Sequence, residues 1–517
     1  MRHKFDTAQM LCQTIKRLFW HESDKCVVLC CEPAARERRK NDMALFVGRE
    51  IERAEFQQLF RKKTASLAVC EGRRRIGKST FVRECAKDAD HFLSFEGLAP
   101  RPNIGRREQL NVFAQRLADQ TKAPKVALEN WPQAFQLLAS LLPKTGRTVL
   151  LLDEISWMAM GEPDFAGHLK VAWDNLFSAY HRLVLVLCGS VTSWIQENIL
   201  NQTGFVGRCS WQFRLAPLAL PFCNLFWRGK EISASEKLKV LSVTGGVPRY
   251  LEEIDPAQSA EQNIKRLCFH PGGLLFREFD QVFHDIFSRR AEAYRKVATA
   301  LAEGPKTVSE ISAALDQERG GTLSAVAEDL VAAGFVSRDA SFDPVTGKTF
   351  PYGFRYRLSD NYLRFYLRCV EPVRVAVEKG LFKWTSLDSL SGWDSLMGLQ
   401  LENLVLGNLA TIFDKIGLAN VPVLNAAPYC RRSAHTQKGC QVDLLIRTRQ
   451  SLYVVEVKFR RQIDKGILSE VRQKVERLKV PRSLSVRTGL VFQGELHPEI
   501  QPSDYFDFLL PFENLLV

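Results

Sequence analysis

Gly72-Arg-Arg-Arg-Ile-Gly-Lys-Ser79 is the stretch that decides the fold of this sequence. Its two glycines, its lysine and its serine have the spacing of a phosphate-binding loop (P-loop). Apolar residues 67–69 precede it and a helical pattern follows, so the loop joins a strand to a helix. Glycines let backbone N–H groups wrap phosphates, and the helix start adds the positive end of its dipole. The stretch therefore predicts a site for ATP.

The positions of the loop have separate expected roles. The Lys78 ammonium is expected to reach the β- and γ-phosphates as a catalytic group, and the Ser79 hydroxyl to bind Mg²⁺. The motif does not require the three arginines, which are either solvated charges or contacts to a partner. The expected nucleotide-binding residues are Gly72, Arg73, Arg74, Arg75, Ile76, Gly77, Lys78, Ser79 and Thr80.

Two further expected strands lead to polar residues that suit a nucleotide site. Apolar residues 149–152 run into Asp153 and Glu154, and apolar residues 183–188 lead to Ser190. Ligands bind at the carboxyl edge of a parallel sheet. We therefore expect Asp153 to hold Mg²⁺ and Glu154 to orient the attacking water. The Ser190 hydroxyl is expected to sense the γ-phosphate or to position water.

An arginine that stabilises the transition state is expected after these strands. Arg208 is the predicted arginine finger, and Arg214 is the alternative. A finger supplied by a neighbouring copy of the chain would require a homo-oligomer, and the sequence leaves the oligomeric state open.

Residues 45–220 alternate short apolar strands with helical stretches, which predicts an α/β fold with a doubly wound parallel sheet. Nearly continuous apolar runs are typical of strands that are buried on both faces. Strands are expected at residues 66–71, 91–95, 148–153, 183–188 and 212–215, and helices between them include 80–87 and 165–180.

The pattern after residue 220 becomes helical and then changes to three helices followed by a strand pair. This is the layout of a winged helix-turn-helix. Thr307 and Glu310 have the spacing of a capping box, and Gly334 is a suitable helix stop. The third helix contains no Arg or Lys, which favours a structural or coupling role over the reading of DNA bases. The helices are expected at 291–302, 307–315 and 322–333, and the strands at 335–341 and 353–358.

The C-terminal α/β segment carries a second candidate site. Glu402 lies on an expected helix, Asp443 on a strand over 441–447, and Glu456 and Lys458 on a strand over 452–458. Residues two apart share one face of a strand, so Glu456 and Lys458 point the same way. We expect Glu402, Asp443 and Glu456 to bind Mg²⁺, and Asp443, Glu456 and Lys458 to act in catalysis. An exposed ion pair is the alternative for Glu456 and Lys458.

Several stretches, together with the P-loop, resemble a known family: Phe46-Val-Gly-Arg-Glu50, Leu152-Asp-Glu154 and Thr244-Gly-Gly-Val-Pro-Arg-Tyr250. They resemble the archaeal-type ATPases of the AAA class, close to the signalling NTPases that have a winged-helix extension. The resemblance implies that Gly48 and Arg49 lie near the base and ribose. It also implies that Pro248 belongs to a helical lid over the nucleotide.

The order of Glu402, Asp443 and Glu456-x-Lys458 resembles the restriction-endonuclease-like fold. A domain of this kind is found at the C-terminus of some archaeal-type AAA ATPases, so the resemblance extends from about residue 45 onward. It implies either a metal-dependent nuclease or a binding module without catalysis. The predicted domains are an extension at 1–43, an AAA-type P-loop core at 44–220, a helical lid at 221–285, a winged helix-turn-helix at 286–375 and a restriction-endonuclease-like domain at 380–517.

Composition sets broad limits on the protein. A chain of 517 residues is too long for a single core. Its 71 Lys and Arg against 58 Asp and Glu give a net charge of +13, which is compatible with a phosphate-rich partner such as DNA. No apolar run approaches the roughly 18 to 20 residues that cross a bilayer. The thirteen cysteines lie scattered in apolar runs, so we expect a cytoplasmic protein without a membrane partner.

Residues 1–43 show no sustained period and are expected to be a disordered extension. Met43 directly precedes the first patterned segment, so the natural start is either Met1 or Met43. The group of Cys26, Cys30, Cys31 and His21 lacks the paired spacing of a zinc site, which disfavours a metal there.

The combined hypothesis is an ATP-hydrolysing switch that uses Mg²⁺ and controls a metal-dependent nuclease-like domain acting on DNA. The alternative is a nucleotide-switched regulator that binds DNA or protein partners and has no nuclease activity.

Overall fold

The computed structural model describes residues 46–517 except 102, 191, 288–290, 317–320, 384–385 and 434–437. The expected extension at 1–43, the choice between Met1 and Met43, and the group of Cys26, Cys30, Cys31 and His21 lie outside the described residues.

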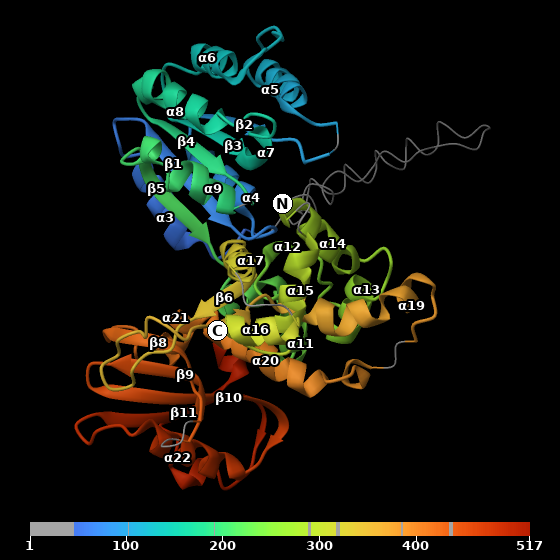
Figure 1. The fold of residues 1–517 in the computed structure, drawn as a ribbon, viewed down its shortest axis with the longest axis vertical. Coiled ribbons are helices and arrows are strands. Elements are labelled where there is room, and N and C mark those ends of the chain that lie inside the picture. The colour runs from blue at the N-terminus through green and yellow to red at the C-terminus, as the bar shows by residue number, and fades with distance from the viewer. Residues whose placement is uncertain are drawn as a thin grey trace, which may run out of the picture. The chain divides into compact units, whose positions relative to one another are not determined.

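The first part of the described chain is built on a five-stranded parallel sheet (Figure 1). The strand order is β2-β3-β4-β1-β5, and all neighbouring strands run parallel. Every residue of β1, β3 and β4 is buried, as the continuous apolar runs predicted. The predicted α/β fold with a parallel sheet is confirmed. The strands are β1 (Ser66–Gly72), β2 (His91–Glu96), β3 (Thr148–Asp153), β4 (Leu183–Cys188) and β5 (Cys209–Leu215).

Helices cover both faces of this sheet because side chains alternate along each buried strand. On one face, Phe56, Phe81 and Phe213 form an aromatic cluster with ring centroids 5.4 to 6.1 Å apart. This cluster joins α3 (Glu50–Leu59), α4 (Lys78–Cys85) and β5. Residues of α5, α6 and α8 share the core of the other face with Leu67 and Val69. The remaining helices of this part are α5 (Arg106–Thr121), α6 (Trp131–Leu141), α7 (Ile155–Met158), α8 (Phe165–Asn175) and α9 (Thr192–Ile195).

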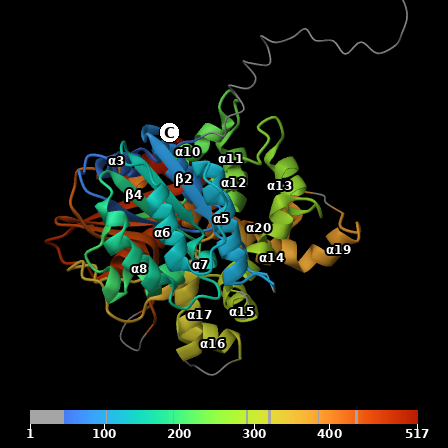
Figure 2. The same ribbon diagram turned by 90° about the horizontal axis from the view of Figure 1, so that it is seen from above.

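A run of helices follows β5, where the helical lid was predicted. Within this run α11 packs beside α13 (Figure 2). The helices are α10 (Leu220–Asn224), α11 (Ala234–Thr244), α12 (Pro248–Leu251), α13 (Ala260–Cys268) and α14 (Leu274–Phe287).

Three helices and an antiparallel strand pair occupy the segment predicted as a winged helix-turn-helix. Thr307 Oγ1 accepts a hydrogen bond from Glu310 N at 3.3 Å, and Glu310 Oε2 accepts one from Thr307 N at 2.8 Å. The predicted capping box is therefore confirmed. Gly334 follows the third helix with a φ of 81°, which suits a glycine stop. The elements are α15 (Ala291–Ala302), α16 (Val308–Ala314), α17 (Gly321–Ala332), β6 (Val336–Asp339) and β7 (Arg355–Leu358).

The loop between β6 and β7 packs on the C-terminal sheet. The Val345 carbonyl oxygen accepts hydrogen bonds from Nε and Nη2 of Arg447 at 3.1 and 2.9 Å. The Gly347 carbonyl oxygen accepts one from Asn425 Nδ2 at 3.2 Å. Phe342 is fully buried in the apolar core that this sheet shares with α22 (Gly466–Leu478). The loop is therefore part of a joint between two segments of the chain.

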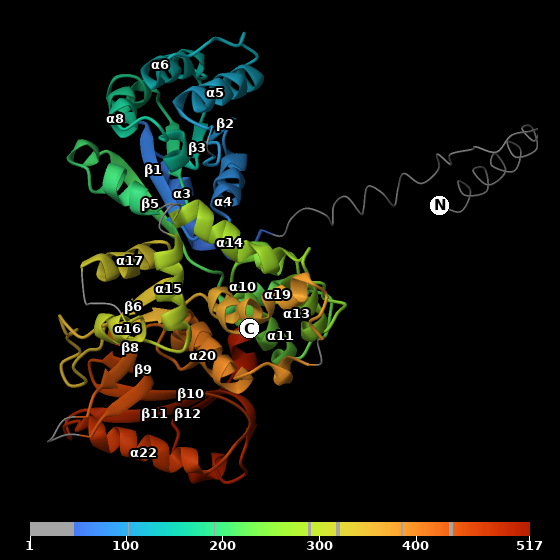
Figure 3. The ribbon, with the colours of Figure 1, turned by 45° about the vertical axis from the view of Figure 1, so that its right-hand side comes forward.

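The C-terminal sheet has the order β12-β11-β10-β9-β8. β9 pairs antiparallel with both β8 and β10, whereas β10, β11 and β12 run parallel. Helices α20 and α22 cover opposite faces of the sheet (Figure 3). The strands are β8 (Val423–Arg431), β9 (Cys440–Thr448), β10 (Ser451–Ile463), β11 (Ser485–Leu496) and β12 (Phe508–Pro511). The helices are α18 (Asn361–Phe365), α19 (Arg374–Glu378), α20 (Trp393–Leu406), α21 (Leu409–Lys415) and α22 (Gly466–Leu478).

Within the described part of the chain, no single helix has the length and apolar character needed to cross a bilayer. The pair α20 and α21 reaches that length and composition only together, and the two helices meet at a bend of 77°.

Candidate nucleotide site and C-terminal acid site

The P-loop connects the central strand β1 to α4. Gly72 ends β1 with a φ of 148°, and a Cβ there would lie 2.6 Å from the Leu215 carbonyl oxygen. Gly77 stands directly before α4 with a φ of 87°, and a Cβ at Gly77 would meet no described atom within 4 Å. The open space in front of the helix start fits a phosphate group, which would face the first amides of α4.

Lys78 is buried at the start of α4. Its ammonium donates hydrogen bonds to the Gly72 carbonyl oxygen at 3.0 Å, the Arg73 carbonyl oxygen at 3.3 Å and Ser190 Oγ at 3.4 Å. The ammonium thus lies inside the loop, where a phosphate would compete with the two carbonyl oxygens for it. The next residue, Ser79, is half-buried, and Thr80 is exposed on the first turn.

The acidic strand end lies two strands from β1, across β4. Glu154 follows β3 in a left-handed conformation with φ 48° and ψ 50°. Ser190, just past β4, donates from Oγ to Glu154 Oε1 at 2.5 Å and from N to Glu154 Oε2 at 3.0 Å. The structure therefore brings together Lys78, Ser190 and Glu154, as the sequence predicted from three separate strand ends.

Asp153, the last residue of β3, is buried, and its Oδ1 accepts a hydrogen bond from Glu154 N at 3.1 Å. Glu96 lies beside it at the end of β2, since the two residues are partners in the strand register. Burial, the negative charge of Asp153 and that of Glu154 raise the pKa of Glu96. Sequence inspection missed Glu96, although its place at the end of an apolar strand was the signal that found Asp153.

The residues expected near the base lie ahead of and after the parallel sheet. Gly48 has a φ of 71°, and a Cβ there would clash with the Phe222 ring at 2.6 Å. The buried Arg49 donates to the Ala216 carbonyl oxygen at 2.6 Å and to Glu52 Oε1 at 3.2 Å. Arg49 thereby fixes the segment that leaves β5. Pro248 is half-buried and opens α12.

The two arginines considered as a finger lie at opposite ends of β5. Arg208 directly precedes the strand and donates to Asp174 through Nε at 2.6 Å and Nη2 at 2.9 Å. Hydrogen bonds from Arg208 and Lys170 lower the pKa of Asp174 to about 2. β5 runs parallel to β1, so Arg208 lies at the sheet edge away from the P-loop, and only the exposed Arg214 lies at the P-loop edge. Arg208 therefore cannot act on the nucleotide of its own chain.

The P-loop and the acidic strand end fall within one matched family region. A family model described as an ATPase domain predominantly from Archaea matches residues 46–254. These residues form an archaeal-type ATPase domain. The protein is an ATPase.

Several known proteins are similar to this ATPase over part of its length. An uncharacterized protein of Methanocaldococcus jannaschii is 23% identical over 357 residues, which span 65% of this chain and 72% of that protein. The Walker-type ATPase PABY2304 of Pyrococcus abyssi is 17% identical, covers 64% of this chain and 97% of its own, and has a TM-score of 0.47. The ORC2 protein of Aeropyrum pernix, solved as ADPNP–ADP complexes, is 13% identical, covers 65% and 96%, and has a TM-score of 0.39.

The C-terminal segment of the ATPase brings the second set of predicted residues into one neighbourhood. Asp443 Oδ2 accepts a hydrogen bond from Val457 N at 2.9 Å, which fixes β9 against β10 beside Glu456. Lys458 Nζ lies 3.3 Å from Glu456 Oε2, so these two side chains share a face as predicted. Glu456 is fully buried, which excludes the exposed ion pair.

Glu402 approaches this group from α20. Burial raises the pKa of Glu402 to about 7, and the negative charge of Asp443 adds to the effect. The same two causes raise the pKa of Glu456 to about 8, against the opposing charges of Lys474 and Lys458. The negative charge of Asp443 thus acts on both glutamates.

Two residues of α22 complete the cluster and were missed by sequence inspection. Lys474 Nζ donates to Glu456 Oε2 at 2.6 Å and lies 3.0 Å from Glu470 Oε1. Glu470 also accepts from Lys458 Nζ at 2.9 Å. The i, i+4 spacing of Glu470 and Lys474 is typical of a surface ion pair. Nothing local indicates that Lys474 reaches a strand 18 residues earlier.

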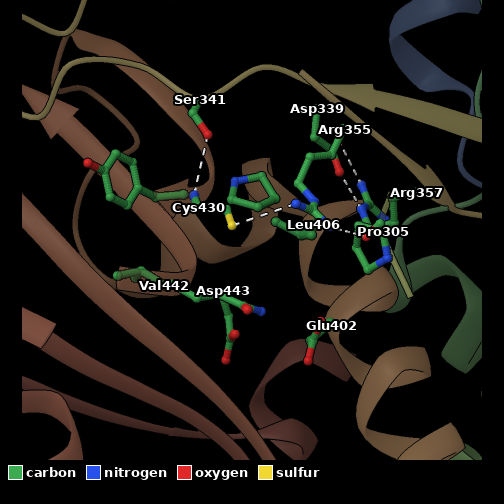
Figure 4. A pocket seen from close by; sticks show the side chains of 13 residues that line it. Pro305, Asp339, Ser341, Arg355, Arg357, Glu402, Leu406, Cys430, Val442 and Asp443 are labelled. Carbon is green, nitrogen blue, oxygen red and sulfur yellow. Dashed lines mark hydrogen bonds and ion pairs between the residues drawn. The ribbon is translucent and has the colours of Figure 1, made fainter. Parts of the chain in front are cut away.

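A pocket lined by Glu402 and Asp443, together with Arg355 and Arg357 of β7, lies beside this group. The carboxylates of Glu402 and Asp443 point to the same side of it (Figure 4). Over the described residues, no three His, Cys, Asp or Glu side chains lie close enough together to hold a metal ion. Binding of Mg²⁺ by Glu402, Asp443 and Glu456 together would therefore need side-chain movement.

Proposed function

We propose that the ATPase is a switch whose nucleotide site controls a Mg²⁺-dependent, nuclease-like site in the C-terminal domain, acting on DNA. One observation carries the proposal. Glu456 is fully buried, and among the described residues its Oε1 atom has no hydrogen-bond donor. A buried carboxylate oxygen without a donor costs about 1 to 3 kcal/mol or more. An ion pair alone does not offset that cost. A metal ion bound at the free oxygen would offset it.

At the nucleotide site, the amides of the P-loop would hold the phosphates, and Lys78 would bridge the β- and γ-phosphates. Ser79 and Asp153 are the oxygen ligands available for Mg²⁺, which would neutralise charge on the phosphates. Glu154 has both carboxylate oxygens fixed by Ser190, which orients it to hold the attacking water. Arg208 is proposed to act on the nucleotide of a neighbouring copy in a homo-oligomer.

At the C-terminal site, Asp443 and Glu456 would hold the metal and Lys458 would stabilise charge on the phosphate under attack. The metal would polarise the phosphate and lower the pKa of a bound water. A restriction-endonuclease-like domain would use these same positions on neighbouring strands. The net charge of +13 supports a polyanionic substrate, for which DNA is the proposal.

The segment over α15–β7 is proposed to be a winged helix that couples the two sites rather than a reader of DNA bases. Its β6–β7 loop, which would be the wing, makes hydrogen bonds to Arg447 and Asn425 of the C-terminal sheet. A loop engaged in this way is not free to lie along a DNA backbone. The loop is therefore proposed to couple the two sites through its packed contacts.

A regulator without nuclease activity is the second candidate, and one observation favours it. Lys474 donates to Glu456 Oε2 at 2.6 Å, so an ammonium already neutralises the central carboxylate. A fixed ion pair of this kind would suit a domain that keeps the fold and binds a partner without cleaving it.

The deciding experiment incubates the full-length protein with supercoiled plasmid and Mg²⁺ or Mn²⁺, with and without ATP. Nicking by wild type that is lost in Glu456→Gln, but kept in Glu499→Gln, would support the nuclease. Glu499 is the matched control because it is an exposed glutamate of the same domain that pairs with the exposed Lys465. Equal absence of nicking in wild type and Glu456→Gln under all conditions would favour the regulator.

A further inference from the structure

The Arg73 side chain leaves the P-loop and becomes buried, with only 4% of its surface exposed. Its Nε forms an ion pair with Asp360 Oδ2, and its Nη2 donates to the Tyr250 hydroxyl at 3.3 Å. The guanidinium also lies 5.1 Å from the centre of the Tyr250 ring and 5.3 Å from that of Phe335. Arg73 is therefore neither a solvated charge nor a contact to another protein.

Asp360 is the residue that holds Arg73 from the other side. It caps the start of α18, where its Oδ1 accepts a hydrogen bond from Leu363 N at 2.9 Å. Its other oxygen faces Arg73. One carboxylate thus joins the P-loop to the start of a helix that lies far along the chain.

Arg75 makes a second connection of the same kind. Its Nε and Nη2 donate to Glu278 Oε1 and Oε2 at 3.0 and 3.2 Å, in a fork that a guanidinium and a carboxylate match well. Glu278 lies on α14, is fully buried and also accepts from the Tyr250 hydroxyl at 3.2 Å. The two connections therefore meet at Tyr250.

These connections act on the atoms that a phosphate would disturb. Lys78 donates to the carbonyl oxygens of Gly72 and Arg73, so the backbone of Arg73 is held by Lys78 and its side chain by Asp360. A phosphate that draws the Lys78 ammonium toward itself removes a hydrogen bond from Arg73. Burying charges is costly unless they are paired, so the Arg73–Asp360 pair resists rearrangement of the loop.

We infer that Asp360 is a positioning residue for ATP, because it sets the place of the P-loop backbone through Arg73. By thermodynamic linkage, phosphate binding in turn changes the strength of the contact between the P-loop and α18. Asp360 does not touch the nucleotide. It positions the loop from the start of α18, and Glu278 positions the loop in the same way through Arg75.

A further step connects α18 to the C-terminal site, and this step alone rests on the proposed function. Arg364 of α18 is fully buried and donates to Gln400 Oε1 and to the Leu399 carbonyl oxygen, both at 3.1 Å. Gln400 lies two residues before Glu402 on α20. If the C-terminal site proves inactive, the link between Asp360 and the nucleotide is tested unchanged.

The test compares Asp360→Asn with Asp339→Asn in the full-length protein. Asparagine is a good helix cap, so Asp360→Asn removes the charge and keeps the cap. Asp339→Asn removes the partner of Arg357 in the same segment and leaves the Arg73–Asp360 pair intact. We expect the KM for ATP to rise at least about fivefold in Asp360→Asn, with kcat changing less, and to stay near the wild-type value in Asp339→Asn.

Two further measurements separate positioning from general support of the fold. Hydrogen exchange at residues 360–366 is expected to respond to a slowly hydrolysed ATP analogue in wild type but not in Asp360→Asn. Glu278→Gln tests the second connection and decides the matter if Asp360→Asn does not fold. An unchanged or lower KM in the folded variants, or an equal rise in Asp339→Asn, would overturn the inference.

Discussion

Ser190 holds both carboxylate oxygens of Glu154, donating from Oγ to Oε1 at 2.5 Å and from N to Oε2 at 3.0 Å. The Ser190 hydroxyl also accepts from the Lys78 ammonium at 3.4 Å. One residue at the end of β4 therefore links the lysine that would meet the phosphates to the glutamate that would hold the water. Since Ser190 contacts both, a change at the phosphates can reach Glu154 through a single side chain.

Glu154→Gln is expected to bind ATP with an affinity close to that of wild type and to hydrolyse it about 100-fold more slowly. The amide keeps the shape of the side chain but cannot act as a base toward water, and a general base contributes about 10² to 10⁴ in rate. Steady-state turnover and binding of a fluorescent ATP analogue measure the two effects separately. Unchanged turnover would remove Glu154 from the water-positioning role.

Lys78→Ala is expected to abolish both binding and hydrolysis of ATP. The change removes the positive charge that would face the phosphates, and it also frees the carbonyl oxygens of Gly72 and Arg73 that Lys78 now engages. Nucleotide binding by calorimetry checks this outcome. Lys170→Ala is the control, because Lys170 lies on α8 and pairs with Asp174 rather than with a residue of the P-loop. A Lys78→Ala protein that still bound ATP tightly would contradict the site.

Arg208→Ala is expected to reduce ATP turnover at least about tenfold if Arg208 serves a neighbouring copy, since arginine fingers contribute about 10³ or more. Asp174→Asn breaks the same ion pair while keeping the arginine, and it is expected to leave turnover nearly unchanged. A mixture of Lys78→Ala and Arg208→Ala chains should turn over ATP faster than either variant does alone. Light scattering with and without nucleotide gives the oligomeric state, and a monomer at all active concentrations would exclude the finger.

The stability of the protein is expected to fall as pH rises from about 5 to about 8, in part because of Glu402 and Glu456. Burial raises the pKa of Glu402 to about 7 and that of Glu456 to about 8. The unfolded value is about 4.3, so in this window the folded chain binds more protons than the unfolded one and loses stability as pH rises. One pKa unit corresponds to about 1.4 kcal/mol, so the effect is of order 4 to 5 kcal/mol for each residue.

Calorimetric melting temperatures of wild type, Glu402→Gln and Glu499→Gln across this pH range test the effect. The glutamine of Glu402→Gln cannot ionise. The melting temperature of this variant should therefore rise relative to that of wild type as pH increases. Glu499→Gln, at an exposed site, should run parallel to wild type. Parallel curves for all three proteins would show that Glu402 ionises normally.

The sequence predicted the parts of the nucleotide site that depend on local order. The P-loop, Asp153–Glu154 and Ser190 each follow an apolar strand, and parallel strands end at one edge, so their meeting follows from topology. The roles of Asp360 and Glu278 were not predictable, because each depends on an arginine more than 200 residues away in the chain. A helix-capping aspartate and a glutamate on an amphipathic helix carry no sign of a distant arginine.

The sequence predicted which residues come together at the C-terminal site, but not the electrostatic interactions among them. Glu402, Asp443, Glu456 and Lys458 come into one neighbourhood, and the negative charge of Asp443 acts on both glutamates. Lys474 was not predicted to join them, although it approaches from α22 and donates to one oxygen of Glu456. A helix face that turns a lysine inward looks, in sequence, like any solvated amphipathic helix.

Phe342 has a practical consequence for dividing the chain. It comes from the β6–β7 loop, well before the domain boundary predicted at 380, yet it is fully buried in the core of the C-terminal sheet. A fragment that begins at residue 380 would lack Phe342, so the apolar surface that Phe342 covers on that sheet would be exposed to water. Arg447 and Asn425 would also lose their hydrogen-bond partners in the loop. Such a fragment would tend to aggregate. The smallest piece that can be expressed with this core filled has to begin before the hairpin, upstream of residue 336.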